Sequence, residues 1–118
     1  MKAVIRCRYQ VHPGPTTKAA KVVIITEKVI LEQVAEVIEA HGATGYTVFA
    51  AGGKGSRGVR PTGRAAVVDG FSNVQIEVIT ATHITAEEIA VDVAERFFQN
   101  YSGITYLEDV EILRSHKF

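Results

Sequence analysis

The chain has 118 residues, and its 13 basic and 13 acidic side chains give a formal net charge of zero. A chain of this length forms one domain that can bury roughly two-thirds of its unfolded surface. The balanced charge argues against a general nucleic-acid binder, because such proteins gain most of their affinity by neutralising phosphates. The single cysteine, Cys7, excludes an intramolecular disulfide and favours a reducing cytoplasm.

Residues 1–18 are predicted to be an N-terminal appendage, and residues 19–118 are predicted to be the folded domain. The run His12-Pro13-Gly14-Pro15 interrupts both helical and strand patterns. We expect residues 1–9 to be loosely held rather than to add an edge strand.

An internal repeat predicts the fold of the remaining chain. In the first half, Ile24-Ile25-Thr26 precedes a helical stretch and then Gly45-Tyr46-Thr47. In the second half, Val78-Ile79-Thr80 precedes a helical stretch and then Gly103-Ile104-Thr105. Two such copies give β-α-β-β-α-β, the ferredoxin-like arrangement of the α+β class.

Local patterns agree with the repeat. Residues 21–26 are a β-branched run, and residues 73–80 alternate apolar and polar side chains, which is typical of strands. A first helix with its C-terminal end at Gly42 is indicated by apolar residues at helical spacing. These residues are Ile30, Leu31, Val34, Ala35, Val37 and Ile38.

A second helix is predicted to open with a capping box. In Thr85-Ala86-Glu87-Glu88, the first and last side chains would satisfy free backbone amides reciprocally. The apolar stripe of this helix then runs through Ile89/Ala90, Val93/Ala94 and Phe97/Phe98, and we expect these aromatic rings and Tyr101 to pack in the core.

Both faces of the predicted sheet carry apolar side chains. Residues 22–25 are consecutive apolar residues, and residues 48–51 are similar. Two helices cover only one face of a sheet, and the chain holds no third layer. Because apolar burial stabilises by roughly 25 cal/mol per Å², we expect a homo-oligomer that covers the open face.

A basic, glycine-rich loop at residues 52–70 is the main candidate for a binding site. It holds six of the ten glycines and four basic residues against one acid, Asp69. Glycines let consecutive amides point at one anion, while lysine and arginine add charge and forked hydrogen bonds. The alternative is a solvated hairpin tip, but the alternation of glycines with basic residues favours anion binding.

Other familiar motifs are excluded or weak. Residues 53–58 match G-x-G-x-x-G, but a dinucleotide-binding loop opens a helix, and Pro61 and Gly63 prevent one. The residue order of a Walker A loop is missing. His12, His41, His83 and His116 lack metal-ligand spacing, so the sequence requires no metal, and it contains no catalytic constellation.

With these motifs the chain resembles the PII-like signalling proteins of the SbtB type and the related carboxysome-associated PII proteins. The resemblance covers residues 20–116, and its most specific part is the loop. The matching segments are residues 23–28, 45–48, 52–60, 86–90 and 101–104.

The resemblance implies a homotrimer with inward-packed sheets and adenine nucleotides (cAMP, AMP, ADP or ATP) in clefts between subunits. The basic loop matches the T-loop of that family, which lies between the second and third strands. Ser56, Arg57 and Arg60 would hold phosphate, and Gly103 would bring backbone close to the adenine from the neighbouring subunit. The implied nucleotide-binding residues are Gly52, Gly53, Lys54, Gly55, Ser56, Arg57, Arg60 and Gly103.

The implied role is control of inorganic-carbon acquisition, through a membrane bicarbonate transporter or a carboxysome component. The protein would be cytoplasmic, with peripheral attachment to the inner membrane through a transporter. Whether bicarbonate itself binds stays open. The T-loop tyrosine and the second glycine-lysine loop of nitrogen-sensing PII proteins are missing, so a response to 2-oxoglutarate is not carried over.

Two alternatives belong to other classes. A slow nucleotide phosphohydrolase, or another ferredoxin-like enzyme, would need a general base, for which Glu27 and Asp69 are candidates only by default. An RNA-binding module of the same topology stacks bases on aromatic residues of a central strand, and residues 73–79 contain none. We therefore expect a signalling protein that is neither an enzyme nor a nucleic-acid binder.

Overall fold

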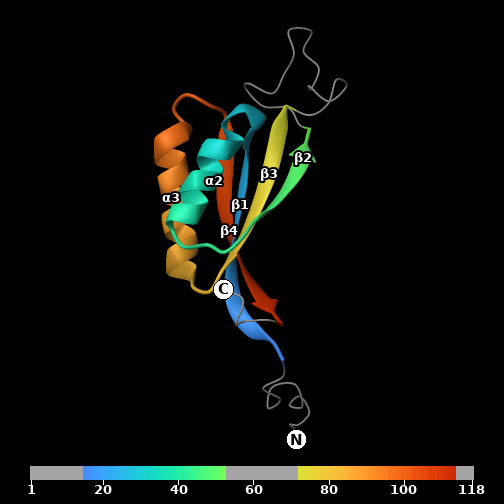
Figure 1. The fold of residues 1–118 in the computed structure, drawn as a ribbon. Helices are drawn as coiled ribbons and strands as arrows, with labels where there is room; N and C mark the ends of the chain where they lie inside the picture. The colour runs from blue at the N-terminus through green and yellow to red at the C-terminus, as the bar shows by residue number, and fades with distance from the viewer. Residues whose placement is uncertain (1–14, 53–71, 114–118) are drawn as a thin grey trace, which may run out of the picture.

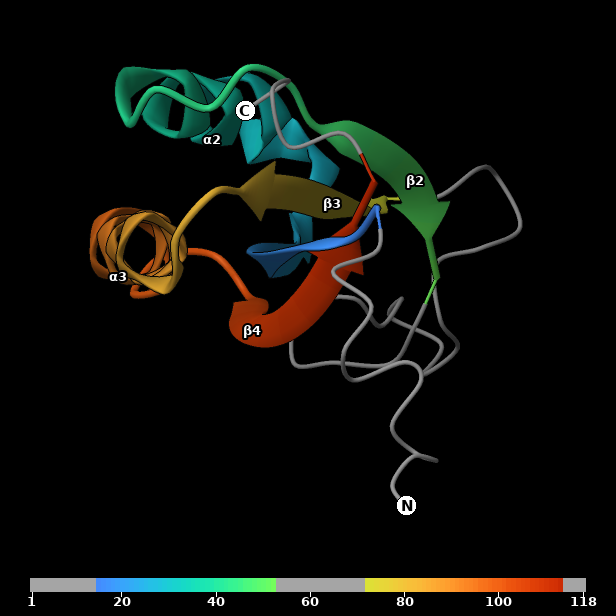
Figure 2. The ribbon, with the colours of Figure 1, turned by 90° about the horizontal axis from the view of Figure 1, so that it is seen from below.

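The computed structural model describes residues 15–52 and 72–113 of the chain. Four antiparallel strands form one sheet in the order β2-β3-β1-β4. The helices α2 and α3 lie together on one face of this sheet (Figure 1 and Figure 2). The element order confirms the β-α-β-β-α-β fold that the internal repeat predicts. The elements are β1 (Thr17–Glu27), the 3₁₀ turn η1 (Lys28–Ile30), α2 (Leu31–Ala40), β2 (Thr47–Ala51), β3 (Asn73–Thr80), α3 (His83–Phe97) and β4 (Gly103–Ile112).

The first strand is longer than its β-branched run. It begins at Thr17, because Thr17 and Lys18 pair with Ile112 and Glu111 of β4. Of the segment predicted to be an appendage, residues 1–14 lie outside the described residues.

The core lies between the helices and the sheet face that they cover. Alternate residues of β1 and β3 meet the apolar stripes of both helices, as the sequence predicts for the two strands and the two helices. Phe97, Phe98 and Tyr101 pack against this core. The core residues include Val22, Ile24, Ile76 and Val78 from the sheet, Val34 and Ile38 from α2, and Ile89 and Val93 from α3.

The C-terminal end of α2 follows the prediction. Gly42 has a φ of 87°, a left-handed conformation that costs glycine little. Its amide donates to the Glu39 carbonyl over 2.9 Å, which closes the last turn. The chain can therefore leave the helix and turn toward β2.

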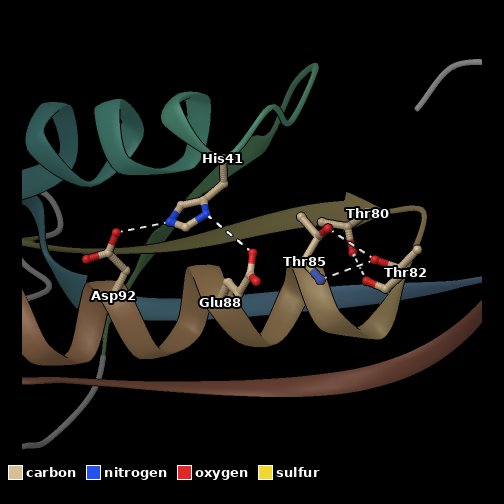
Figure 3. A network of polar contacts seen from close by, with 6 residues as sticks. All are labelled: His41, Thr80, Thr82, Thr85, Glu88 and Asp92. Carbon is tan, nitrogen blue, oxygen red and sulfur yellow. Dashed lines mark hydrogen bonds and ion pairs between the residues drawn. The ribbon is translucent and has the colours of Figure 1, made fainter.

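The predicted start of α3 is wrong by one helical turn. The N-cap is Thr82 rather than Thr85, since Thr82 has extended backbone and its hydroxyl accepts from the Thr85 amide over 3.2 Å. Thr85 already lies inside the helix, where its hydroxyl accepts from that of Thr82 (Figure 3). Only Thr85 is followed by the glutamate of a capping box, but β3 already ends at Thr80, and Thr82 therefore caps the helix one turn earlier.

Among the described residues, no helix lies over the other face of the sheet (Figure 2). Phe49, Ile104 and Tyr106 are 46%, 57% and 41% exposed there. A charged group lies among them, because the Nζ of Lys21 is 3.1 Å from Glu108 Oε1 and 3.8 Å from Glu77 Oε1. The hydrogen bond to Glu108, reinforced by the charges of both glutamates, raises the pKa of Lys21. We call this surface the open face.

Neither helix that the structure describes is long and apolar enough to cross a membrane.

Candidate functional site

One end of the sheet gathers the segments that the sequence connects with binding. β1 and β2 finish there at Glu27 and Ala51, and β3 and β4 begin there. The register confirms the alignment, with Asn73 opposite both Glu27 and Ala51, and Gly103 opposite Thr26. Gly52 and Gly103 therefore lie at the same end of the sheet, the upper end in Figure 1.

Gly52 and Gly103 lie on opposite edges of that end. Gly52 follows β2 and Gly103 begins β4, and these two edge strands have β3 and β1 between them. Since neighbouring strands are about 4.8 Å apart, three spacings separate the two glycines by roughly 14 Å. One phosphate cannot contact both glycines within a subunit.

The remaining predicted phosphate-binding residues cannot be placed on this frame. Gly53, Lys54, Gly55, Ser56, Arg57 and Arg60 lie outside the described residues, as does Asp69. The described chain resumes at Ser72, whose carbonyl accepts from the Lys28 amide over 2.8 Å. This bond ties the start of β3 to the turn that follows β1.

Gly103 is required by packing, whatever it binds. A Cβ atom at this position would collide with the ring of Phe98 and would lie 3.0 Å from the Ile25 carbonyl oxygen. The half-buried Phe98 ring packs against the core and would have to shift to make room for a side chain at position 103. The close contact with adenine proposed for Gly103 stays a prediction, and the structure supplies a separate reason for glycine here.

The sequence analysis does not predict a group of hydrogen bonds that lies beside Gly103. Glu27 Oε2 accepts from the Ser102 amide over 2.7 Å and from the Ser102 hydroxyl over 3.3 Å. The preceding residue of β1, Thr26, donates its hydroxyl to the Ser102 carbonyl over 2.8 Å. We call these contacts of Thr26 and Glu27 with Ser102 the Ser102 clasp.

The sequence contains a signal for this clasp. In an antiparallel β1–β4 pair, the end of one strand lies beside the start of the other. The predicted fold therefore brings Thr26-Glu27 close to Ser102-Gly103. The sequence marks Glu27 as an acid–base candidate only by default, and in the structure its Oε2 atom accepts hydrogen bonds from Ser102.

A second polar group joins the helices on the side away from the open face (Figure 3). His41 Nε2 lies 3.0 Å from Asp92 Oδ2, and His41 Nδ1 lies 3.9 Å from Glu88 Oε1. Arg96 Nε donates to Asp92 Oδ1 over 2.6 Å. The hydrogen bonds from His41 and then Arg96 lower the pKa of Asp92. His41 thus links α2 to α3 and has a structural role.

A shallow hollow of about 430 Å³ lies next to this group, between His41 and the outer side of α3. Within the described ranges, no group of three or more His, Cys, Asp or Glu side chains is arranged to hold a metal ion.

The fold and the sheet end define a ferredoxin-like protein with a long connection between β2 and β3, and the comparisons identify its family. The family model "Nitrogen regulatory protein P-II" matches residues 19–117. The chain therefore belongs to the P-II family, as its resemblance to PII-like signalling proteins predicts.

Solved structures agree with this assignment. A PII-like signalling protein from Thermus thermophilus is 30% identical, with a TM-score of 0.71, and the match covers 87% of this chain and 97% of that one. CPII from Thiomonas intermedia, bound to ADP and bicarbonate, is 22% identical with a TM-score of 0.72 over 87% of this chain and 96% of that one. A further CPII structure, bound to ADP, AMP and bicarbonate, is 20% identical with a TM-score of 0.64 over 82% and 94%.

Proposed function

We propose that this PII-like protein senses adenine nucleotides, which it binds in clefts between the subunits of a homotrimer. The observation that carries the proposal is the position of Gly52 and Gly103 at one end of the sheet but on its opposite edges. A cleft between two subunits can combine the β2 edge of one with the β4 edge of the other.

The chemistry of the loop that follows Gly52 suits a phosphate. Its glycine amides and its side chains Lys54, Ser56, Arg57 and Arg60 offer many donors to one anion. Gly103 has no side chain and would let the neighbouring backbone approach a flat base closely. The CPII structures that share this fold hold ADP, AMP and bicarbonate, which supports the same class of ligands here.

The open face supports assembly. Phe49, Ile104 and Tyr106 leave apolar surface beside the group formed by Lys21, Glu77 and Glu108. Burial of such apolar surface against a second copy would stabilise the assembly, because it removes this surface from water. We propose that the open faces of three copies turn toward one another, which leaves the sheet edges to form the clefts.

The biological output follows from this arrangement. The nucleotide, which includes cAMP among its candidates, would change the loop that a protein partner contacts. By its resemblance to the SbtB type, that partner is a bicarbonate transporter at the inner membrane or a carboxysome component, and the protein itself is cytoplasmic. Bicarbonate would act as a second ligand of the same site.

The enzyme alternative finds less support. A phosphohydrolase needs a carboxylate that can take a proton from water, and Glu27 Oε2 already accepts two hydrogen bonds from Ser102.

Isothermal titration with cAMP, AMP, ADP and ATP, each with and without bicarbonate, tests the proposal. The double variant Arg57→Ala/Arg60→Ala should weaken binding of every nucleotide by at least about tenfold, because each arginine offers charge-assisted hydrogen bonds to phosphate. Arg96→Ala is the matched control, since Arg96 lies on α3 and pairs with Asp92. Failure of all four nucleotides to bind the wild-type protein would refute the proposed function.

A further inference from the structure

A short series of hydrogen bonds crosses the sheet end that carries the proposed site. The Ser72 carbonyl, just before β3, accepts from Lys28, and the neighbouring residue Glu27 accepts from Ser102. Ser102 is followed by Gly103, the first residue of β4. Hydrogen bonds of residues 27–28 thereby connect Ser72, at the start of β3, to Ser102, at the start of β4.

The strongest bond in this series is that of Glu27. An amide that donates to a carboxylate over 2.7 Å is a charge-assisted hydrogen bond, which is stronger than a bond between neutral groups. The Thr26 hydroxyl holds the carbonyl of the same residue from the other side. Ser102 is therefore held at its amide, its hydroxyl and its carbonyl by two consecutive residues of β1.

The clasp acts on Ser102 and Gly103, and other bonds maintain the preceding turn. The amides of Asn100 and Tyr101 both donate to the Phe97 carbonyl, over 3.1 and 2.9 Å. These backbone bonds do not involve Glu27, so loss of its carboxylate leaves the end of α3 and the core intact. The carboxylate holds the N–H of the Tyr101–Ser102 peptide, and the Thr26 hydroxyl holds the carbonyl of the Ser102–Gly103 peptide. Glu27 therefore sets the position from which the backbone enters Gly103.

We propose that Glu27 is a positioning residue of the nucleotide site, which holds the Ser102–Gly103 backbone in the orientation that an adenine nucleotide requires. This inference rests on the proposed function. Glu27 acts through Ser102 and does not itself contact the ligand. The amide of the next residue, Lys28, donates to the Ser72 carbonyl, so the same turn also contacts the start of β3.

Two variants of Glu27 separate positioning from folding. Glu27→Ala removes the acceptor of the Ser102 amide. Because the lost charge-assisted bond positions the backbone and does not contact the ligand, nucleotide binding should weaken by about tenfold. Glu27→Gln keeps an oxygen acceptor without the charge and should recover part of that affinity. Glu87→Ala and Glu87→Gln are matched controls on the exposed side of α3, and they should bind as the wild type does.

The amide proton resonance of Ser102 provides a readout that does not depend on any nucleotide. A short bond to a carboxylate shifts this resonance downfield, and the shift should be lost in Glu27→Ala and kept in the Glu87 variants. Thermal unfolding, measured in parallel, shows whether the variant is folded at the titration temperature.

The possible results are distinct. Weaker binding by folded Glu27→Ala, with partial recovery in Glu27→Gln, supports the inference. Equal affinity of wild type and Glu27→Ala, with the Ser102 resonance moved, overturns the inference and leaves the nucleotide function standing. A wild-type protein that binds no nucleotide overturns the proposed function, and the positioning role falls with it.

Discussion

The two faces of the sheet differ most clearly along β4. Ile104 and Tyr106 are apolar and point to the open face, where they are 57% and 41% exposed. Thr105 between them points to the helices, and its hydroxyl is buried without a hydrogen-bond partner among the described residues. Residues 104–106 of this strand thus place apolar groups outside and a polar group inside, the reverse of what one isolated subunit would favour.

The two faces differ in how completely a single chain buries their apolar side chains. The helix-covered face is completed within one chain, since Val22, Ile24, Ile76 and Val78 are fully buried there. The open face leaves Phe49, Ile104 and Tyr106 exposed beside the ion pairs of Lys21, and exposed apolar surface rimmed by polar groups is a feature of interaction sites. The predictions below test this difference.

The largest change in stability is expected at Ile24, which lies on the opposite face of β1 from its neighbour Ile25. Ile24→Ala should lower the free energy of unfolding by about 4 kcal/mol, because it leaves a cavity in the sealed core. Ile25→Ala, on the half-buried open side, should cost clearly less within the subunit, and any further loss from the proposed subunit contact should depend on protein concentration. Denaturant unfolding at constant protein concentration measures both, and equal losses would show that the faces do not differ in this way.

A charge on the open face should act on assembly rather than on the fold. Ile104→Asp should convert the proposed trimer to smaller species in light scattering coupled to size exclusion, because a carboxylate would be buried between subunits. Far-ultraviolet circular dichroism should stay unchanged. Ile84→Asp, at an apolar position of α3 that is 65% exposed, is the control and should keep the wild-type mass. An unchanged mass for Ile104→Asp would place the subunit contact elsewhere.

Thr105→Val should stabilise the protein by about 1 kcal/mol, since valine has a similar shape and removes a buried hydroxyl that has no partner in the described part of the chain. Thr80→Val is the opposite case, because the Thr80 hydroxyl donates to the Thr82 carbonyl over 2.7 Å and its loss should destabilise. Thermal and denaturant unfolding would measure both changes. A Thr105→Val protein less stable than wild type would indicate that the hydroxyl has a partner in solution.

The smallest expected effect is the pH dependence that the ion pairs of Lys21 on the open face add to stability. The raised pKa of Lys21 means that its ion pairs contribute stability that is fully present below the ordinary lysine pKa of about 10.5 and is lost as the pH rises through the folded-state pKa. Nuclear magnetic resonance titration of the Nζ group should give a midpoint above that value. Glu108→Gln should lower the midpoint, because the Glu108 carboxylate is the main cause of the shift. A midpoint that Glu108→Gln leaves unchanged would contradict this assignment.

The sequence alone determined the order of elements, the apolar stripes of both helices and the class of protein. These features depend on local periodicity, on turn chemistry at Gly42 and on a repeated motif, all of which are visible in consecutive residues. The capping-box pattern predicts a helix start at Thr85, because Glu88 follows it by three residues, whereas the end of β3 allows the helix to begin earlier, at Thr82.

The tertiary structure decided what depends on residues far apart in the chain. The pairing of β1 with β4 brings Glu27 to Ser102 and Ile25 to Gly103, and the packing of Phe98 explains why Gly103 carries no side chain. The strand order places Gly52 and Gly103 on opposite edges of one sheet end. Local propensities do not encode such distances, because strand order and register arise only when the whole sheet closes around its core.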